Sequence, residues 1–231
     1  MPTPISLDAV VLQRGSFILD VPKLDIESGQ VVGLVGANGA GKSTLIDLMA
    51  GKLRPSKGTV RTAGFDPVAD PVNARLAAAH MVDEQPVLDL PLERVLDLIA
   101  GFYPTWDHEL CARLIERFQL QKDKRASQLS KGEGTRLRLL LAMAWRPQIL
   151  LLDEPGTGLD PRLRRAMLSE VLEIVRDPRR TVLFSTHQVD DVERVCDRLL
   201  LLSKGRIIAD GPADSVVPDG ATLEQMLVEL P

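Results

Sequence analysis

The chain has 231 residues, of which 45% are hydrophobic, so it can bury one substantial core with a smaller lobe attached. Its formal net charge of −4 gives no overall basic surface, and no nucleic-acid partner is expected. The start of the chain lacks the basic flank and apolar stretch of a secretory signal, and no apolar run approaches the roughly 20 residues that span a bilayer. We therefore expect a cytoplasmic protein.

The cysteines are Cys111 and Cys196. Each falls in a stretch with helical periodicity, and their spacing does not match that of a metal site. Because cytosolic proteins keep their thiols reduced, we expect two packed free thiols and no disulfide bridge.

The N-terminal part of the chain predicts strands around one helix. Apolar residues alternate loosely over residues 5–27 and are interrupted by a turn at 14–16, which indicates a β-hairpin. An apolar strand at 31–35 is followed by a glycine-rich turn. An amphipathic helix over 43–50 comes next, and Gly51 stands where a C-terminal glycine cap belongs.

Two more strands are expected before the pattern changes. A short one covers residues 59–62, and a buried one covers 77–82. The prolines Pro67 and Pro71 predict irregular chain over residues 66–70.

Residues 86–147 are expected to form a helical lobe inserted into the core. Apolar residues recur at three- and four-residue spacing over 92–102 and 107–120, and a third helix is expected over 133–145. Pro147 ends that helix because proline cannot continue it. Ordinary core helices without a separate role are the alternative interpretation.

The rest of the chain completes a core lobe made of residues 1–85 and 148–231. The run 149–152 is entirely aliphatic, as in a central parallel strand that is buried on both faces. Further strands are expected at 181–185, 198–202 and 206–209, and helices at 161–176 and 190–196. The elements predict an α/β fold with a mostly parallel sheet flanked by helices, an N-terminal antiparallel β section and the inserted helical lobe.

The glycine-rich turn fills every fixed position of the phosphate-binding motif G-x-x-x-x-G-K-[ST]. In such a loop backbone N–H groups converge on phosphate oxygens, which requires the conformational freedom of glycine. Lys42 is expected to reach the β- and γ-phosphates, and Ser43 to hold Mg²⁺ at the positive end of the helix. A glycine turn that merely joins strand to helix is the alternative. The expected nucleotide-binding residues are Gly36, Ala37, Asn38, Gly39, Ala40, Gly41, Lys42, Ser43 and Thr44.

Two carboxylates, Asp153 and Glu154, follow the aliphatic strand at the edge where open α/β sheets bind ligands. Because neighbouring residues of a strand point in opposite directions, the two serve different purposes. Asp153 is predicted to hold Mg²⁺ and Glu154 to polarise the attacking water. The alternative is a pair that merely caps the strand. His187 follows another aliphatic strand at the same edge and is a further catalytic candidate, although a lone histidine is more often structural.

Six motifs occur in order along the chain: GANGAGKST at 36–44, Gln85 after a strand, LSKGE at 129–133, ILLLDEP at 149–155, GLD at 158–160 and STH at 185–187. With these motifs the chain resembles the nucleotide-binding domain of ATP-binding cassette (ABC) transporters over nearly its whole length. The resemblance implies a P-loop NTPase (RecA-like) core, ATP and Mg²⁺ as cofactors, and ATP hydrolysis as the reaction.

The resemblance also implies roles that the residue types alone do not. Gln85 is implied to sense Mg²⁺ and the γ-phosphate and to couple the core to the helical lobe. His187 is implied to be the switch histidine at the γ-phosphate, and Asp160 the D-loop aspartate. Ser130 and Gly132 occupy positions of the family's LSGGQ motif, which one cassette presents to ATP held by another. A second cassette, either identical or a close paralogue, is therefore an implied partner.

The chain departs from the family pattern at three places. Lys131 and Glu133 replace a glycine and the glutamine of LSGGQ, and both remain candidate ATP contacts. The D-loop stretch reads GTGLD at 156–160, a mild change. No tyrosine stands where the family stacks an aromatic ring on the nucleotide, and either Phe17 or Arg14 takes that position.

The stretch 103–107 and the lysine of LSKGE resemble bacterial ABC-2 type cassettes, which pair with separate integral membrane subunits and commonly export antibiotics, peptides, lipids or ions. The resemblance thus implies an export ATPase at the inner face of the cell membrane. The alternative is a soluble single-cassette ATPase that acts in cofactor assembly or on nucleic acid or ribosomes. A GTPase or phosphotransferase would leave LSKGE unexplained.

Overall fold

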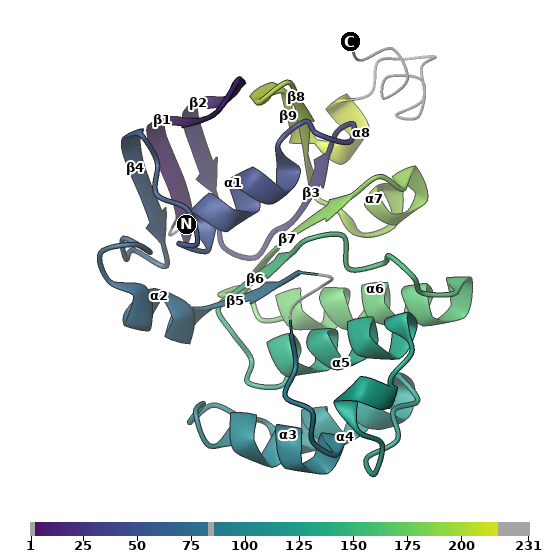
Figure 1. The fold of residues 1–231 in the computed structure, drawn as a ribbon. Coiled ribbons are helices and arrows are strands. Elements are labelled where there is room, and N and C mark those ends of the chain that lie inside the picture. Colours follow the sequence, from purple (N-terminus) through teal and green to yellow (C-terminus); the bar gives the residue numbers. More distant parts are fainter. Residues whose placement is uncertain (1–2, 83–85, 217–231) are drawn as a thin grey trace.

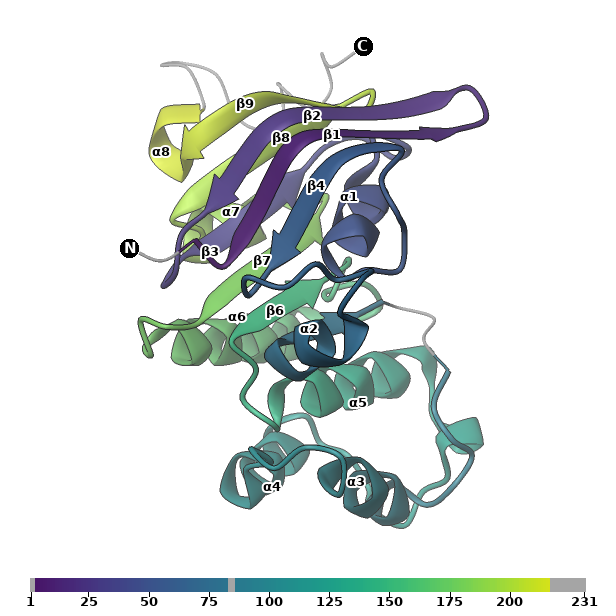
Figure 2. The same ribbon diagram turned by 90° about the vertical axis from the view of Figure 1, so that its left-hand side faces the viewer.

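The computed structural model of the chain describes residues 3–82 and 86–216. Within these residues two β-sheets and the helices form successive layers (Figures 1 and 2). The smaller sheet is antiparallel and N-terminal, and the larger sheet is mostly parallel. Both parts of the predicted α/β architecture are therefore confirmed.

The smaller sheet has three strands in the order β2-β1-β4. Strands β1 (Ile5–Arg14) and β2 (Phe17–Ile26) form the predicted hairpin, and β4 (Lys57–Thr62) pairs with the other edge of β1. Buried and exposed residues alternate along β1 and β2, as they do in strands with one face against a core.

The larger sheet has the strand order β5-β6-β7-β3-β8-β9, and only β9 runs antiparallel to its neighbour. Its strands are β3 (Val31–Val35), β5 (Ala78–Met81), β6 (Ile149–Leu152), β7 (Thr181–Thr186), β8 (Arg198–Ser203) and β9 (Arg206–Pro212). Strand β6 lies inside the sheet and all its residues are buried. Ile149 and Leu151 join one apolar cluster, and Leu150 and Leu152 join another. This confirms that the aliphatic run is buried on both faces.

Helix α1 (Lys42–Met49) packs in the apolar cluster that both sheets share. Leu45, Ile46, Leu48 and Met49 of this helix are fully buried there. Gly51, with a φ of 71°, donates its amide to the carbonyl oxygen of Leu48 and ends the helix as predicted.

Four helices lie on the side of the large sheet away from the small one, with α5 and α6 next to the sheet and α3 and α4 beyond α5 (Figure 1). They are α3 (Leu92–Ala100), α4 (His108–Arg117), α5 (Lys131–Met143) and α6 (Pro161–Val175). Helix α5 begins two residues before the predicted start, because Ser130 caps it. One apolar cluster contains residues of these helices and of β5, β6 and β7, with Phe118 fully buried in it. The division into a core lobe and a helical lobe stays a prediction.

The irregular chain predicted over 66–70 is confirmed, but the helix that follows it was not predicted. This helix is α2 (Pro71–Ala77), with Pro71 at its first position and the Asp70 side chain accepting a hydrogen bond from the Asn73 amide. Proline is compatible with the first turn of a helix because the N–H that it lacks has no partner there. Helix α7 (Val189–Val195) agrees with its prediction. The short helices η1 (Ala126–Gln128) and α8 (Ala213–Val216) were not predicted.

Both cysteines are free, as predicted, and burial raises the pKa of each thiol. In the described part of the chain, every helix is too short or too polar to cross a membrane.

Candidate active site

A cavity of about 270 Å³ lies where β3 ends and α1 begins. Residues from three separate parts of the sequence line it: the hairpin strand β2, the glycine loop with the first turn of α1, and the end of β6. They are Phe17, Asn38, Gly39, Gly41, Lys42, Ser43, Thr44 and Glu154. The structure therefore brings most of the predicted phosphate-binding loop together with one of the two predicted carboxylates.

Glycine is required at two positions of this loop. A Cβ atom on Gly36 would lie 2.2 Å from the carbonyl oxygen of Leu202, and Gly41 has a φ of 109°, which L side chains rarely adopt. A Cβ atom on Gly41 would also lie 2.7 Å from Cζ of Phe17. Phe17 thus packs against the loop and lines the cavity, whereas Arg14 is not among the lining residues.

Lys42 lies inside the loop and is only 7% exposed. Its Nζ donates hydrogen bonds to the carbonyl oxygens of Gly36, at 2.8 Å, and Ala37, at 3.3 Å. The same Nζ is 3.8 Å from Oε1 of Glu154. Two carbonyl groups of the glycine loop therefore hold the Lys42 ammonium group at the cavity wall, and the Glu154 carboxylate lies next to it.

A chain of hydrogen bonds joins the ends of β6 and β7. Ser185, which is fully buried, donates from Oγ to Oδ1 of Asp153 at 2.6 Å and accepts the Glu154 amide at 2.9 Å. Nδ1 of His187 is 2.8 Å from Oε2 of Glu154. Because an ionised carboxylate only accepts hydrogen bonds, this ring nitrogen carries the proton when Glu154 is ionised. Glu154 itself has a φ of 51°, in the left-handed region.

The LSKGE stretch forms the N-terminus of α5, apart from this cavity. Oγ of Ser130 accepts the Glu133 amide at 3.3 Å, and Oε2 of Glu133 accepts the Ser130 amide at 2.8 Å, which is a capping box. Nζ of Lys124 is 2.9 Å from both carboxylate oxygens of Glu133. The hydrogen bond from Lys124 contributes most, and with the bonds to Ser130 it lowers the pKa of Glu133 to about 2. Glu133 is thus held within its own cap.

The stretch packs against the GTGLD loop. A Cβ atom on Gly132 would lie 2.8 Å from the carbonyl oxygen of Gly158. Asp160 caps α6 by accepting the amides of Arg162 and Leu163, both at 2.9 Å. Neither Asp160 nor any residue of 129–133 lines the phosphate-loop cavity of the same chain.

The structure places the remaining predicted residues as follows. Asp153 accepts a hydrogen bond from Ser185 but is not among the residues that line the cavity, and Gln85 lies outside the described residues. Sequence reasoning did not assign a role to Ser185, although a serine at the end of an aliphatic strand, within STH, was the available signal. It also missed Arg164, which lies near His187, because no motif contains it.

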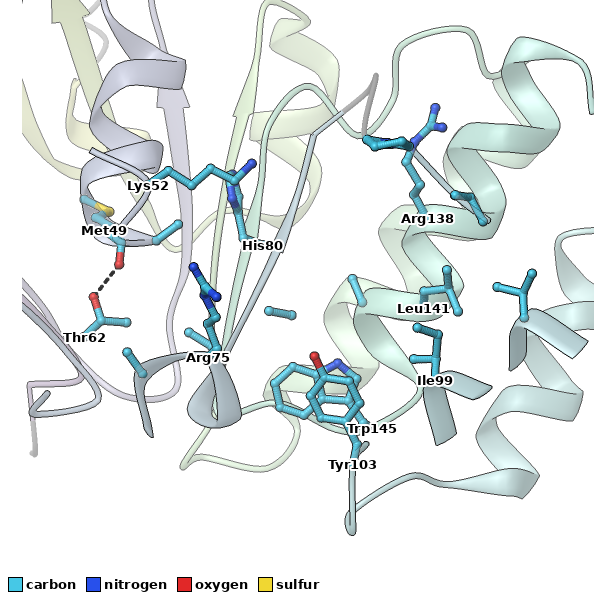
Figure 3. A pocket seen from close by; sticks show the side chains of 18 of the residues that line it. Met49, Lys52, Thr62, Arg75, His80, Ile99, Tyr103, Arg138, Leu141 and Trp145 are labelled. Carbon is cyan, nitrogen blue, oxygen red and sulfur yellow. Dashed lines mark hydrogen bonds between the residues drawn. The ribbon is translucent and has the colours of Figure 1, made fainter. Parts of the chain in front are cut away.

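A second and larger cavity, of about 460 Å³, lies beside the C-terminal end of α1, between α2, β5, α3 and α5 (Figure 3). His80 of β5 lines it and is 10% exposed; among the described residues neither of its ring nitrogens has a hydrogen-bond partner, and Nε2 lies 3.9 Å from Oδ1 of Asp47. Burial lowers the pKa of His80 to about 4, so the ring is neutral at pH 7. Tyr103 and Trp145, with ring centroids 4.4 Å apart, stack at another part of the lining (Figure 3). We call this space the His80 cavity.

Comparison with known proteins agrees with the motifs. A family model described as ABC transporter matches residues 19–157, more than half of the chain. Nod factor export ATP-binding protein I of Neorhizobium galegae is 39% identical over 225 residues, which cover 93% of this chain and 64% of that relative. The chain therefore spans less than two thirds of that protein's length.

Two further matches cover nearly the full length of both this chain and the protein compared with it. Thiamine import ATP-binding protein ThiQ of Jannaschia sp. (strain CCS1) is 33% identical over 229 residues, which are 94% of this chain and 96% of that protein. A solved structure of the ATP binding subunit of an ABC transporter superimposes with a TM-score of 0.86 and 30% identity, and 99% of each chain is covered. On this sequence match, this fold and the geometry of its glycine loop, the chain belongs to the ABC transporter family, as one of its ATP-binding cassettes.

Proposed function

We propose that the chain binds Mg·ATP in the phosphate-loop cavity and hydrolyses it. The observation that carries this proposal is the position of the Glu154 carboxylate, 3.8 Å from Nζ of Lys42 and 2.8 Å from Nδ1 of His187. A carboxylate beside the lysine of a phosphate loop is placed to accept a proton from water that attacks the γ-phosphate. When ATP is bound, Nζ of Lys42 contacts phosphate oxygens in place of Glu154 and the carbonyl oxygens of the loop.

In this mechanism each residue has one task. The loop amides and Lys42 hold the β- and γ-phosphates, and the N-terminus of α1 adds its partial positive charge. Glu154 orients the attacking water and takes its proton. His187 fixes the Glu154 carboxylate through Nδ1, and we propose that it also orients the γ-phosphate.

The residues present fit a magnesium ion as the companion of ATP. Mg²⁺ uses one or two protein ligands together with substrate phosphates and water. Ser43 lines the cavity, and Asp153 uses Oδ1 for Ser185, which leaves its second oxygen. In the described part of the chain no cluster of three or more histidines, cysteines or acids forms an all-protein metal cage, which agrees with this arrangement. We propose Ser43 and Asp153 as ligands, with Gln85 as the third; bound Mg²⁺ neutralises charge on the phosphate oxygens.

The active unit that we propose is a dimer of cassettes. Residues 129–133 cap α5 and do not line the cavity of their own chain, so Ser130, Lys131 and Gly132 contact ATP that a second copy or a close paralogue holds. Helix α5 directs its N-terminal partial charge toward that nucleotide. Asp160 caps α6 two residues after Gly158, which packs against Gly132, and we place it at the same proposed interface.

We further propose that the cassette works with a separate integral membrane subunit at the inner face of the cell membrane. The relative with the highest identity given above is an export protein, and we propose export for this chain too. The His80 cavity suits a docking segment of that subunit, because its lining combines apolar side chains and the neutral His80 ring with the basic side chains of Lys52, Arg75 and Arg138. Leu88, 59% exposed, adds apolar surface to its lining.

The variant Glu154→Gln tests the hydrolytic proposal in the purified full-length chain. We expect ATP binding within about threefold of wild type, turnover lowered by at least about a hundredfold, and a dimer that forms only with ATP. Wild-type turnover in this variant would remove Glu154 from the mechanism. Nucleotide affinity is measured by calorimetry, turnover by phosphate release and dimerisation by gel filtration.

Docking is tested by co-expression with the membrane protein encoded by the adjacent gene. We expect His80→Phe to reduce the amount of cassette that co-purifies, and His108→Phe, an exposed histidine on α4, to leave it unchanged. Equal co-purification of both variants would show that the His80 cavity is not the docking site.

A further inference from the structure

Arg164, in the second turn of α6, joins the two loops that carry Glu154 and His187. Its Nε is 2.9 Å from Oδ1 of Asp191 on α7, and its Nη1 donates to Oε1 of Gln188, the residue after His187. A Cβ atom on Gly156 would lie 3.1 Å from Cδ of Arg164, so the stem of the arginine lies against the loop that follows Glu154. The Arg164 side chain therefore contacts three segments: the loop after Glu154, the residue after His187, and helix α7.

The contacts of Gln188 and Asp191 show that this is a built arrangement. Gln188 is the N-cap residue of α7, but its side chain makes no capping hydrogen bond and goes to Arg164 instead. The Asp191 side chain is 4% exposed and Arg164 is its ion-pair partner. Burial raises the pKa of Asp191, and the nearby guanidinium opposes that shift.

His187, by contrast, has little packing of its own. Its side chain is 56% exposed, and its hydrogen bond to Glu154 is the side-chain contact that the structure records for it. Its position therefore depends on its backbone, which is fixed on one side by β7 and on the other by Gln188. Gln188 donates its amide to Oγ1 of Thr186 and offers its side chain to Arg164.

We propose that Arg164 is a positioning residue that holds His187 against Glu154. This inference rests on the proposed function, because it needs His187 to act in ATP hydrolysis. The rigid fork of a guanidinium can donate to Asp191 and Gln188 at once, whereas a lysine ammonium on a flexible stem cannot reproduce that geometry. Displacement of a catalytic group by about 1 Å can cost about a hundredfold in rate.

The test is a double-mutant cycle of Arg164→Lys and His187→Ala in the full-length chain. Lysine keeps the positive charge next to buried Asp191, so the variant is expected to fold, while Arg164→Gln would leave that carboxylate without a counter-ion. We expect Arg164→Lys alone to lower kcat about tenfold, with KM for ATP changed less than twofold. In the His187→Ala background the same substitution should have no further effect on kcat.

Arg165→Lys is the matched control, because Arg165 is the exposed neighbour on α6, and it should retain wild-type kcat. The proposal is overturned if Arg164→Lys has wild-type kcat, or if its loss multiplies with that of His187→Ala. Failure of the proposed function is distinguishable: in that case His187→Ala alone would hydrolyse ATP at the wild-type rate. The urea midpoints of all four variants establish that each is folded.

Discussion

The variant Ser185→Ala removes the hydroxyl that links the two carboxylates of the site. Ser185 is fully buried, donates to Asp153 at 2.6 Å and accepts the Glu154 amide at 2.9 Å. Loss of one charge-assisted and one neutral hydrogen bond costs about 2 to 3 kcal/mol of unfolding free energy. Glu154 also holds a left-handed φ of 51°. That conformation costs roughly 1 kcal/mol, so without the bond the backbone is free to relax.

We therefore expect kcat to fall by about tenfold to a hundredfold, since Glu154 and Asp153 both move from their productive positions. ATP affinity should stay within about threefold of wild type, because Ser185 is not among the residues that line the cavity. Steady-state phosphate release and calorimetry measure the two quantities, and urea denaturation measures the stability loss. The control is Ser169→Ala on α6, whose hydroxyl donates to the Arg165 carbonyl at 2.9 Å.

A wild-type kcat in Ser185→Ala, together with lowered stability, would refute the reasoning. It would mean that the hydroxyl stabilises the fold without positioning Glu154.

Two further predictions concern the nucleotide and the LSKGE cap. Phe17→Leu keeps an apolar contact with the loop but loses the aromatic face, so Kd for ATP should rise about fivefold to tenfold, whereas Arg14→Ala should leave it unchanged; equal effects in calorimetry would contradict the assignment. Because the folded pKa of Glu133, about 2, lies below its ordinary value of 4.5, its stabilisation is present above about pH 4.5 and is lost as the pH falls toward 2. Glu133→Gln keeps a capping side chain but not the pair with Lys124, so it should lose about 1 kcal/mol at pH 7 after allowance for solvent screening, and less than half of that at pH 3, where Glu133 of the folded protein is still mostly ionised. Urea denaturation at both pH values is the measurement, and an equal loss at both would show that the ion pair contributes nothing.

Local chemistry was enough to predict much of this protein. The glycine loop at 36–44, the fully aliphatic strand at 149–152 and the alternating hairpin at 5–27 depend on spacing and on hydrophobic pattern, which the sequence displays directly. The carboxyl ends of parallel strands meet at one edge of a sheet, so the meeting of Glu154 with Lys42 and His187 could also be expected. Helix α2 was missed because proline was taken as a breaker, although it also starts helices.

Other features depended on contacts between distant parts of the chain. The sequence left Phe17 and Arg14 as equal candidates; the structure puts Phe17 against Gly41 in the cavity lining, and its stacking on the nucleotide stays a prediction. The structure places Glu133 in a cap with Lys124, and its contact with ATP stays a prediction.

The fold class, the family and the identity of the phosphate loop were thus determined by the sequence, because they depend on motifs and hydrophobic patterns within short runs of neighbouring residues. The bonds of Ser185, the contacts of Arg164 and the burial of the His80 ring were decided by the tertiary structure. Each of them joins segments from different strands or helices, and no local pattern encodes which polar side chains meet across a packed core.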